Sequence, residues 1–480
     1  MAQLKVVLHE ELLEHNSQDS CWIAVYGTVY DFTDFLSQHP GGANILLQNA
    51  GKDASSTFGL YHPRDFLDQL PPAAIVGRYS SPVESRESLI NPKSEERDLP
   101  VSHILNVYDF ARNARKRLSK EAWDYLVSAA DDEVTYRMNE VAYEKFWIKP
   151  RVMFNVSGII DTSVTLFGTR SSSPIYISAT AMGRLYHPDG EMALARGAYA
   201  AGVIQMCPTL GSCSIEEVAS VRAPDQTQWF QLYVHEKWEV TLSIIKRAEE
   251  AGMRVLCITV DVAMMGKRER DQRNRLIVDL SHIQKDHDKK ADKSRGVGKS
   301  LSSFVFPGLD WAYLRKIRSA TNLPILLKGI QTGEDAVLAY ESGLCQGIIV
   351  SNHGGRQLDY SRPTVDCLDE IVHALRAIGA RINNDFDLYV DGGIRRGTDI
   401  FKCLAMGAKA VGVGRPSLFA LASHGPEGVT HLIDLLNDEL RLAMMHTGCT
   451  SVSEITRSAL ERSPFNPIIL ARRELHESRL

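Results

Sequence analysis

The sequence predicts an α/β protein in which a (β/α)₈ TIM barrel follows a smaller, separate domain. Eight short runs of apolar and β-branched residues alternate with amphipathic helical stretches between residues 174 and 413. That span agrees with the ~250 residues of a typical barrel. A polar stretch ahead of the barrel separates it from the N-terminal segment.

Residues 79–100 form that polar stretch. They contain five serines, three prolines and eight charged residues, and almost no side chain that could join a core. This composition is typical of a mobile linker. We therefore expect a small domain over residues 1–78, a linker over 79–100 and the barrel domain over 101–480.

Charge and cysteine usage argue against several classes of protein. Residues 1–78 hold four basic and nine acidic residues, which accounts for the net charge of −5 of the whole chain. Nucleic-acid binding usually needs a basic surface, so it is not expected, whereas an acidic small domain suits a basic protein partner.

No run of 18 apolar residues is present, so we expect no membrane span. The eight cysteines form no C-x-x-C pair, which favours buried free thiols over disulfides or a zinc site.

Eight segments are expected to be strands. Continuous apolar runs that alternate with helices indicate parallel strands buried on both faces. A doubly wound sheet is the rival architecture, but its G-x-G-x-x-G motif after the first strand is missing. The expected strands are Pro174–Ala179, Gly202–Cys207, Gln228–Val234, Val255–Val260, Pro324–Lys328, Gly347–Ser351, Asp387–Val390 and Ala410–Val413.

Chemically useful residues gather where these strands end, which is where barrel enzymes carry their active sites. A single Asp or Lys after a strand is more often a helix cap or a surface charge, but agreement across several strands favours an active site. The residues, in strand order, are Ser178, Ala179, Thr180, Ala181, Gln231, Tyr233, Thr259, Asp261, Lys328, His353, Arg356, Asp391, Gly392, Gly393, Ile394, Arg395, Gly414 and Arg415.

His353 is the candidate base. Two glycines follow it and clear space beside it, and Arg356 is a candidate clamp for a carboxylate. Asp261 is expected to orient the imidazole and to raise its pKa by stabilising the protonated form. The alternative is that His353 is merely structural, as histidines in loops often are.

Glycine-rich turns after the seventh and eighth strands each lead into an arginine, Arg395 and Arg415. Backbone N–H groups at a helix start and a bidentate cation together bind phosphate, so we expect a phosphorylated cofactor. Lys328 either stabilises negative charge on the ring of that cofactor or forms an ion pair inside the barrel mouth.

Three segments carry a specific resemblance. SNHGGRQLD at 351–359, VDGGIRRGTD at 390–399 and VGVGRP at 411–416 resemble the active-site and phosphate-binding segments of the FMN-dependent 2-hydroxy acid oxidases and dehydrogenases. The similarity runs over about residues 100–460. It implies a barrel that holds FMN and oxidises an L-2-hydroxy acid to the 2-keto acid.

The resemblance also implies roles for individual residues. His353 is the base paired with Asp261, Arg356 and Tyr125 bind the substrate carboxylate, Tyr233 bonds the substrate hydroxyl, and Arg268 is a second arginine near the site. The FMN-binding set is Ser178 to Ala181, Gln231, Thr259, Lys328, Asp391 to Arg395, Gly414 and Arg415. Pro208 departs from the pattern, because a serine near the flavin is usual at its position.

The N-terminal domain has its own signal. The segments YDFT at 30–33 and HPGG at 39–42 are followed by His62, and His39 and His62 lie 23 positions apart. Two histidines among apolar residues can clamp a haem from both faces and leave no open iron position, which suits electron transfer. Residues 4–78 resemble cytochrome b5, which implies a small α+β fold, haem b, and His39 and His62 as iron ligands.

The order of the two domains resembles that of the flavocytochrome b2 family. It implies that electrons pass from substrate to FMN, then to haem, then to an external basic acceptor such as cytochrome c. Ala181 and Leu210 match a pocket for L-lactate. The alternatives are an FMN oxidase that passes electrons to O₂, and a haem-binding redox module with an inactive barrel.

Assembly and location are expected from weaker signals. The resemblance implies a homotetramer. No Arg- and Ser-rich leader precedes residue 4, and the chain ends Ser478-Arg479-Leu480, a variant of the S-K-L peroxisomal address. We expect peroxisome or cytosol, and the mitochondrial intermembrane space if a leader is missing.

Overall fold

The chain divides into two compact units, Met1–Arg97 and Asp98–Leu480. This computed structural model describes residues 5–40, 42–55, 57–58, 62, 66–67, 70–80, 98–274 and 304–463. The last strand of the first unit continues to Ser80, two residues into the expected linker. Most of that linker, 81–97, and the terminal tripeptide 478–480 lie outside the described residues.

The N-terminal unit is a small α+β fold around a five-stranded sheet of order β1-β5-β4-β3-β2. Tyr26 and Gly27 both have positive φ and form the two-residue turn between β3 and β4. One face of the sheet packs on a core that includes Ile23, Phe32 and Leu46. The elements are β1 (Val6–Leu8), α1 (His9–Glu14), β2 (Asn16–Ser17), β3 (Ser20–Val25), β4 (Thr28–Asp31), η1 (Thr33–Phe35), α2 (Ala43–Asn49), η3 (Pro72–Ala74) and β5 (Ile75–Ser80).

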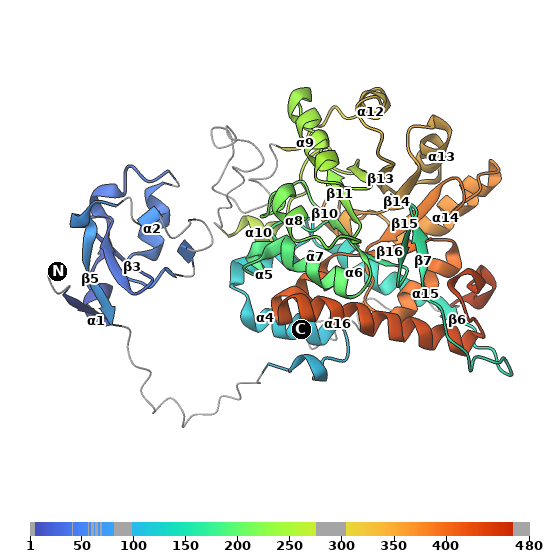
Figure 1. Ribbon diagram of the computed structural model, residues 1–480, viewed down its shortest axis with the longest axis horizontal. Coiled ribbons are helices and arrows are strands. Elements are labelled where there is room, and N and C mark those ends of the chain that lie inside the picture. Colours follow the sequence, from blue (N-terminus) through green and yellow to red (C-terminus); the bar gives the residue numbers. More distant parts are fainter. Residues whose placement is uncertain are drawn as a thin grey trace. The chain divides into compact units, whose positions relative to one another are not determined.

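The second unit contains a closed barrel of eight parallel strands, which confirms the expected fold (Figure 1). Parallel pairing of β16 with β9 closes the ring. All eight predicted strands are present, and their residues are almost entirely buried. They are β9 (Ile175–Ile177), β10 (Ile204–Cys207), β11 (Gln228–Leu232), β12 (Leu256–Thr259), β13 (Ile325–Ile330), β14 (Gly347–Val350), β15 (Asp387–Asp391) and β16 (Ala410–Val413).

Local chemistry moves the strand ends by at most two residues from the prediction. Pro174 has no N–H to donate, and β9 begins after it. Gly202 has a φ of +69° and belongs to the turn before β10. β13 runs on through Ile330, with a shift in register at Gly329.

An apolar floor fills one end of the barrel. The rings of Tyr176, Trp229 and Tyr389 meet there with centroids 5.5–5.9 Å apart. The hairpin of β7 (Val164–Leu166) and β8 (Thr169–Ser171) adds Phe167, whose ring lies 5.8 Å from that of Trp229. The residues that the sequence predicted for the site lie instead at the carboxyl ends of the strands.

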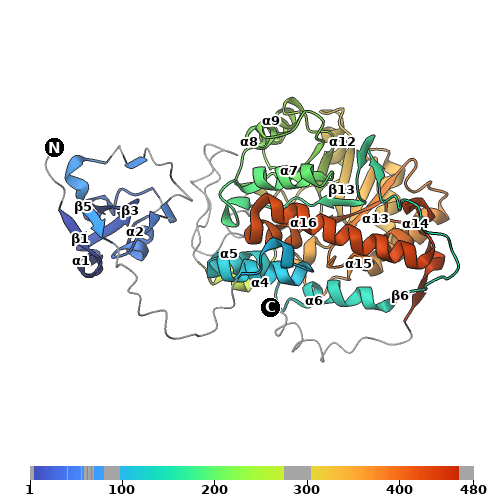
Figure 2. The same cartoon turned by 60° about the horizontal axis from the view of Figure 1, so that its bottom comes forward.

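Helices surround the barrel, and the long α16 lies beside α4 and α7 (Figure 2). Before the barrel come η5 (Val101–His103), α4 (Val107–Arg117), α5 (Lys120–Val127), α6 (Val134–Val141), η6 (Ala142–Lys145) and β6 (Phe146–Ile148), which pairs with β17 (Leu460–Arg462). The others are η7 (Gly183–Leu185), α7 (Gly190–Ala200), α8 (Ile215–Ser220), α9 (Trp238–Glu250), α10 (Glu269–Gln272), α12 (Trp311–Arg318), α13 (Gly333–Ser342), η10 (His353–Gly355), α14 (Thr364–Ala377), α15 (Gly397–Met406), α16 (Arg415–Thr447), η11 (Val452–Glu454) and η12 (Arg457–Ala459).

Two further expectations can be compared with the structure. All eight cysteines are free and buried, as predicted. Among the described residues, no helix combines the length and the apolar character needed to cross a membrane.

Candidate active site

A cavity opens at the carboxyl ends of the barrel strands. Every barrel residue that the sequence predicted for the site lines it, except Asp261, which contacts His353 from outside the lining. The lining residues are Tyr125, Ser178, Ala179, Thr180, Ala181, Gln231, Tyr233, Thr259, Arg268, Lys328, His353, Arg356, Asp391, Gly392, Gly393, Ile394, Arg395, Gly414 and Arg415, joined by Leu126, Tyr186, Pro208, Leu210, Met265, Gly354, Gly412, Val413, Pro416 and Leu418.

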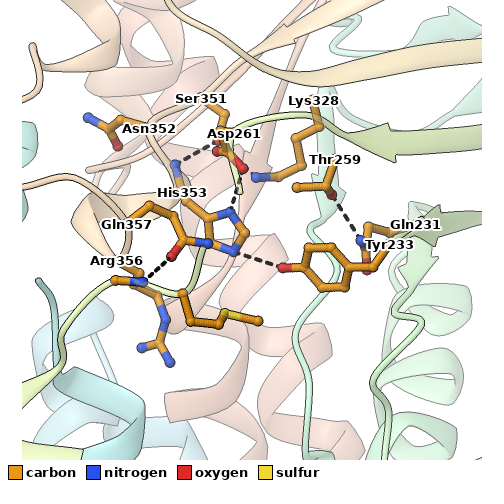
Figure 3. A network of polar contacts seen from close by, with 12 residues as sticks. Gln231, Tyr233, Thr259, Asp261, Lys328, Ser351, Asn352, His353, Arg356 and Gln357 are labelled. Atoms are coloured by element: carbon orange, nitrogen blue, oxygen red, sulfur yellow. Dashed lines mark hydrogen bonds and ion pairs between the residues drawn. The ribbon is translucent and has the colours of Figure 1, made fainter. Parts of the chain in front are cut away.

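His353 lies between Asp261 and Tyr233 (Figure 3). Its Nδ1 is 2.9 Å from Oδ1 of Asp261, and its Nε2 is 3.3 Å from the hydroxyl oxygen of Tyr233. A carboxylate beside Nδ1 places the proton on that nitrogen. The lone pair of the neutral imidazole is therefore on Nε2, at the cavity.

The expected direction of the His353 pKa is wrong. Burial lowers the pKa of His353 below its ordinary value of 6.5, and this outweighs the Asp261 carboxylate, which raises it. Burial raises the pKa of Asp261, but the positive charges of His353 and Lys328 bring it below its ordinary value. At neutral pH the pair is a neutral imidazole beside an ionised carboxylate, which is the state that a base needs.

Strained backbone holds His353 in place. His353, Gly354 and Gly355 have φ of +57°, +65° and +75° in succession, a conformation that β-carbons disfavour. A β-carbon on Gly355 would lie 2.7 Å from the backbone nitrogen of Tyr136, so glycine is required there. Asn352 stabilises the turn, because its Oδ1 accepts a hydrogen bond of 3.3 Å from the Gly355 N–H.

Lys328 forms the ion pair that was one of its two expected roles, and its side chain also lines the cavity. Its Nζ lies 3.4 Å from Oδ2 of Asp391 and donates a 2.9 Å hydrogen bond to Oγ of Ser351. Burial lowers the pKa of Lys328, but the carboxylates of Asp391 and Asp261 raise it above its ordinary value. Gly329 permits this arrangement, because a β-carbon there would lie 2.5 Å from that of Asp261.

Two arginines share one side of the cavity: Arg268, which is buried, and Arg356, which is half-buried. NH1 of Arg356 donates to the carbonyl oxygens of Tyr125, Leu126 and Ser128 at 3.0, 3.3 and 3.0 Å, which fixes the guanidinium. Arg268 donates to the carbonyl oxygen of Arg356. Burial and the charge of Arg356 lower the pKa of Arg268 to about 10. Two adjacent cations favour an anion between them, such as a carboxylate.

A second cationic region lies where α16 begins. Arg415 donates to the carbonyl oxygens of Leu126, Gly354 and Ser128. Burial lowers its pKa to about 9. Arg395 instead pairs with Glu140 at 2.8 Å. A helix N-terminus next to the half-buried Arg415 guanidinium is a suitable phosphate site.

Two hydroxyls identify where a cofactor fits. Oγ of Ser178 and Oγ1 of Thr180 are buried in the cavity wall and have no hydrogen-bond partner within the described part of the chain. Unpaired buried hydroxyls are uncommon and indicate a missing ligand. With the phosphate region and Lys328, they fit a phosphorylated flavin with polar ring edges.

In the N-terminal unit, His39 and His62 face one another. Their ring centroids are 6.1 Å apart, and the rings of Phe35, Phe58 and Phe66 surround them at 5.0–5.9 Å. Two metal–nitrogen bonds of ~2 Å plus the ring radii give a similar separation of about 6 Å. Nδ1 of His39 lies 3.2 Å from the carbonyl oxygen of Gly42, which leaves Nε2 available as a ligand. These residues fit a haem with two axial histidines.

The sequence prediction missed several residues of the barrel site. Oγ of Ser351, in the SNHGGRQLD segment, links Lys328, Asp391 and the backbone N–H of His353, a role that the sequence prediction did not assign to it. Tyr186 and Met265 line the cavity from positions farther along the loops, where no strand-end signal points to them.

Comparisons with known proteins agree with both sites. The FMN-dependent dehydrogenase family matches residues 114–462, and the cytochrome b5-like heme/steroid binding domain matches residues 9–80. The L-lactate dehydrogenase (cytochrome) of Wickerhamomyces anomalus is 44% identical, over 94% of this chain and 79% of its own length. Glycolate oxidase 3 of Arabidopsis thaliana is 41% identical, over 77% of this chain and 99% of its own.

Solved structures give the same result. A point mutant of flavocytochrome b2 aligns with a TM-score of 0.68 at 36% identity, covering 78% of this chain and 93% of that one. A mandelate oxidase mutant aligns with a TM-score of 0.65 at 37% identity, covering 75% of this chain and 98% of that one. This chain therefore belongs to the FMN-dependent dehydrogenase family, as an enzyme that carries FMN in its barrel and haem b in a cytochrome b5-like domain.

Proposed function

We propose that the enzyme oxidises L-lactate to pyruvate and passes the electrons through FMN and haem b to an external acceptor such as cytochrome c. The observation that carries the proposal is the His353 network, in which a neutral imidazole exposes Nε2 to a cavity that Arg268 and Arg356 also line. Relatives named L-lactate dehydrogenase (cytochrome) share both domains with this chain.

Each of the barrel residues has a separate role in the proposed reaction. Arg356 and Tyr125 hold the substrate carboxylate, and the Tyr233 hydroxyl bonds the substrate hydroxyl. Nε2 of His353 accepts a proton as the substrate loses two electrons, and Asp261 stabilises the imidazolium that results. When bound, FMN would supply the acceptor for the electron pair and for the second proton that the substrate loses, and Lys328 lies where it can stabilise negative charge.

The substrate assignment depends on pocket size. Leu210 and Ala181 line the cavity and leave room for a short side chain. Leu210→Trp should lower kcat/KM for L-lactate relative to glycolate, which has no methyl group to accommodate. An unchanged ratio of the two kcat/KM values would contradict this assignment.

A direct experiment tests the proposed function. L-lactate, added without oxygen to protein loaded with FMN and haem, should bleach the flavin and then reduce the haem, whereas D-lactate should do neither. Cytochrome c should then reoxidise the protein much faster than O₂ does. Faster turnover with O₂ would favour the oxidase alternative, and a flavin that stays oxidised would overturn the proposal.

We also propose an electron acceptor, an oligomeric state and a cellular compartment for the enzyme. The acidic first domain suits a basic acceptor through electrostatic steering, which predicts a reduction rate that falls with salt. Exposed apolar side chains support a homotetramer, because such surface is typical of an interface: Val152, Met153 and Ile159 are 81%, 100% and 92% exposed. The molecular mass from analytical ultracentrifugation tests the homotetramer. A fluorescent fusion with and without residues 478–480 tests the expectation of peroxisome or cytosol.

A further inference from the structure

Tyr186 is a polar residue of the cavity that the proposed mechanism does not use. Its side chain lines the cavity and is 6% exposed. Its hydroxyl is buried and has no hydrogen-bond partner among the residues that the structure describes. An unpaired buried hydroxyl destabilises a fold, so a ligand that pairs with it would account for its presence.

A rigid turn positions Tyr186. The residue ends the short helix η7, and its N–H donates to the carbonyl oxygen of Gly183. The N–H of Gly183 donates in turn to the buried carboxylate of Glu191, which also accepts hydrogen bonds from Ser212. A β-carbon on Gly183 would lie 2.7 Å from the nitrogen of Glu191, so the turn has little freedom. The Tyr186 ring is therefore held at the cavity before any ligand binds.

The charged neighbours of Tyr186 indicate which part of the substrate it faces. Burial raises the pKa of Tyr186 well above its ordinary value, the Tyr125 side chain raises it further, and the Arg356 guanidinium lowers it. Tyr233, in contrast, lies against His353, at the other part of the site. Tyr186 is thus protonated at neutral pH and lies beside the two groups assigned to the substrate carboxylate.

We propose that the Tyr186 hydroxyl donates a hydrogen bond to the carboxylate of the substrate, as a third ligand beside Arg356 and Tyr125. A carboxylate has lone pairs for about four donors, so the Tyr186 hydroxyl can be accommodated beside Arg356, Tyr125 and the neighbouring Arg268. The inference rests on the proposed function, since it requires a 2-hydroxy acid in the cavity. It makes Tyr186 a residue that selects for a carboxylate, distinct in role from Tyr233.

The test is Tyr186→Phe, which removes one oxygen and keeps the ring. The KM for L-lactate and the dissociation constant of oxalate, an unreactive dicarboxylate followed by its effect on the flavin spectrum, should each rise about 10-fold or more. The limiting rate of flavin reduction should change much less than KM, because the base is intact. Tyr176→Phe is the matched control. The Tyr176 hydroxyl is also buried and unpaired within the described residues, but Tyr176 lies in the apolar floor of the barrel.

The outcomes separate this inference from the proposed function. Unchanged KM and oxalate binding in Tyr186→Phe would overturn the inference, and so would an equal rise in Tyr176→Phe. If L-lactate fails to reduce the wild-type flavin, the proposed function fails, and oxalate binding still decides whether Tyr186 contacts a carboxylate. FMN content equal to that of the wild type establishes that both variants are folded.

Discussion

The two cofactor sites of this chain are built in different ways. In the barrel, each reacting group is held by another polar group: His353 by Asp261, and Lys328 by Ser351 and Asp391. In the N-terminal unit, His39 and His62 face each other among phenylalanine rings. The barrel site is therefore preorganised by its own hydrogen bonds, whereas the haem site depends on two ligands and an apolar wall.

This difference indicates how each site should fail. Removing one polar group from the barrel leaves a large apolar core intact, so the chemistry should be lost while the cofactor stays bound. Removing one axial histidine deprives the haem of half its protein ligands, so that cofactor should be lost or altered. The two functions should then be separable by single substitutions.

The largest effect is expected at His353. His353→Gln keeps a similar volume but cannot accept the proton, so flavin reduction by L-lactate should slow by ~10²–10⁴-fold or more. FMN and haem contents should match those of the wild type. Rapid-mixing absorbance at the flavin band measures the rate, and a rate near that of the wild type would mean that the base lies elsewhere.

A smaller effect is expected at the carboxylate end. Arg356→Lys replaces a planar guanidinium, which three backbone carbonyl oxygens hold in place, with a single ammonium group. KM should rise and turnover should fall, with kcat/KM lower by about 10–100-fold through the loss of a charge-assisted pair. Steady-state kinetics with L-lactate provide the measurement. Kinetics equal to those of the wild type would remove Arg356 from the substrate site.

The smallest effect is expected in the pH dependence of flavin reduction. The base must be neutral to act, and burial lowers the pKa of His353 below 6.5, so the rate of flavin reduction should fall with decreasing pH with a midpoint below 6.5. Asp261→Asn removes a charge that raises this pKa, so the decline should move to still lower pH while the maximal rate also falls. A decline centred above pH 6.5 in the wild type, or one that moves upward in the variant, would contradict this assignment.

Sequence reasoning succeeded where one physical rule determines position. Parallel strands must place their carboxyl ends at the same end of a barrel, so residues as distant in sequence as Ser178, Lys328 and Arg415 could be assigned to one cavity. The assignment of His39 and His62 to haem followed from resemblance, and the structure places their ring centroids 6.1 Å apart, which is compatible with that assignment.

The errors arise from quantities that a residue list does not contain. The direction of the His353 pKa depends on how deeply the ring is buried, and Asp261 alone suggested the opposite direction. Tyr186 escaped notice because its hydroxyl becomes significant only once its burial and lack of a partner are known. Pairing with β1 carries β5 through to Ser80, two residues beyond the predicted boundary at residue 78.

The most direct test follows flavin and haem absorbance together after L-lactate is mixed, without oxygen, with the wild type, His353→Gln and His62→Ala. In the wild type, flavin reduction should precede haem reduction, and in His353→Gln both should be slow. In His62→Ala the haem signal should be lost or altered while the flavin is reduced at the rate of the wild type. Rapid haem reduction in His353→Gln, or slow flavin reduction in His62→Ala, would contradict the assignment of substrate oxidation to the barrel alone.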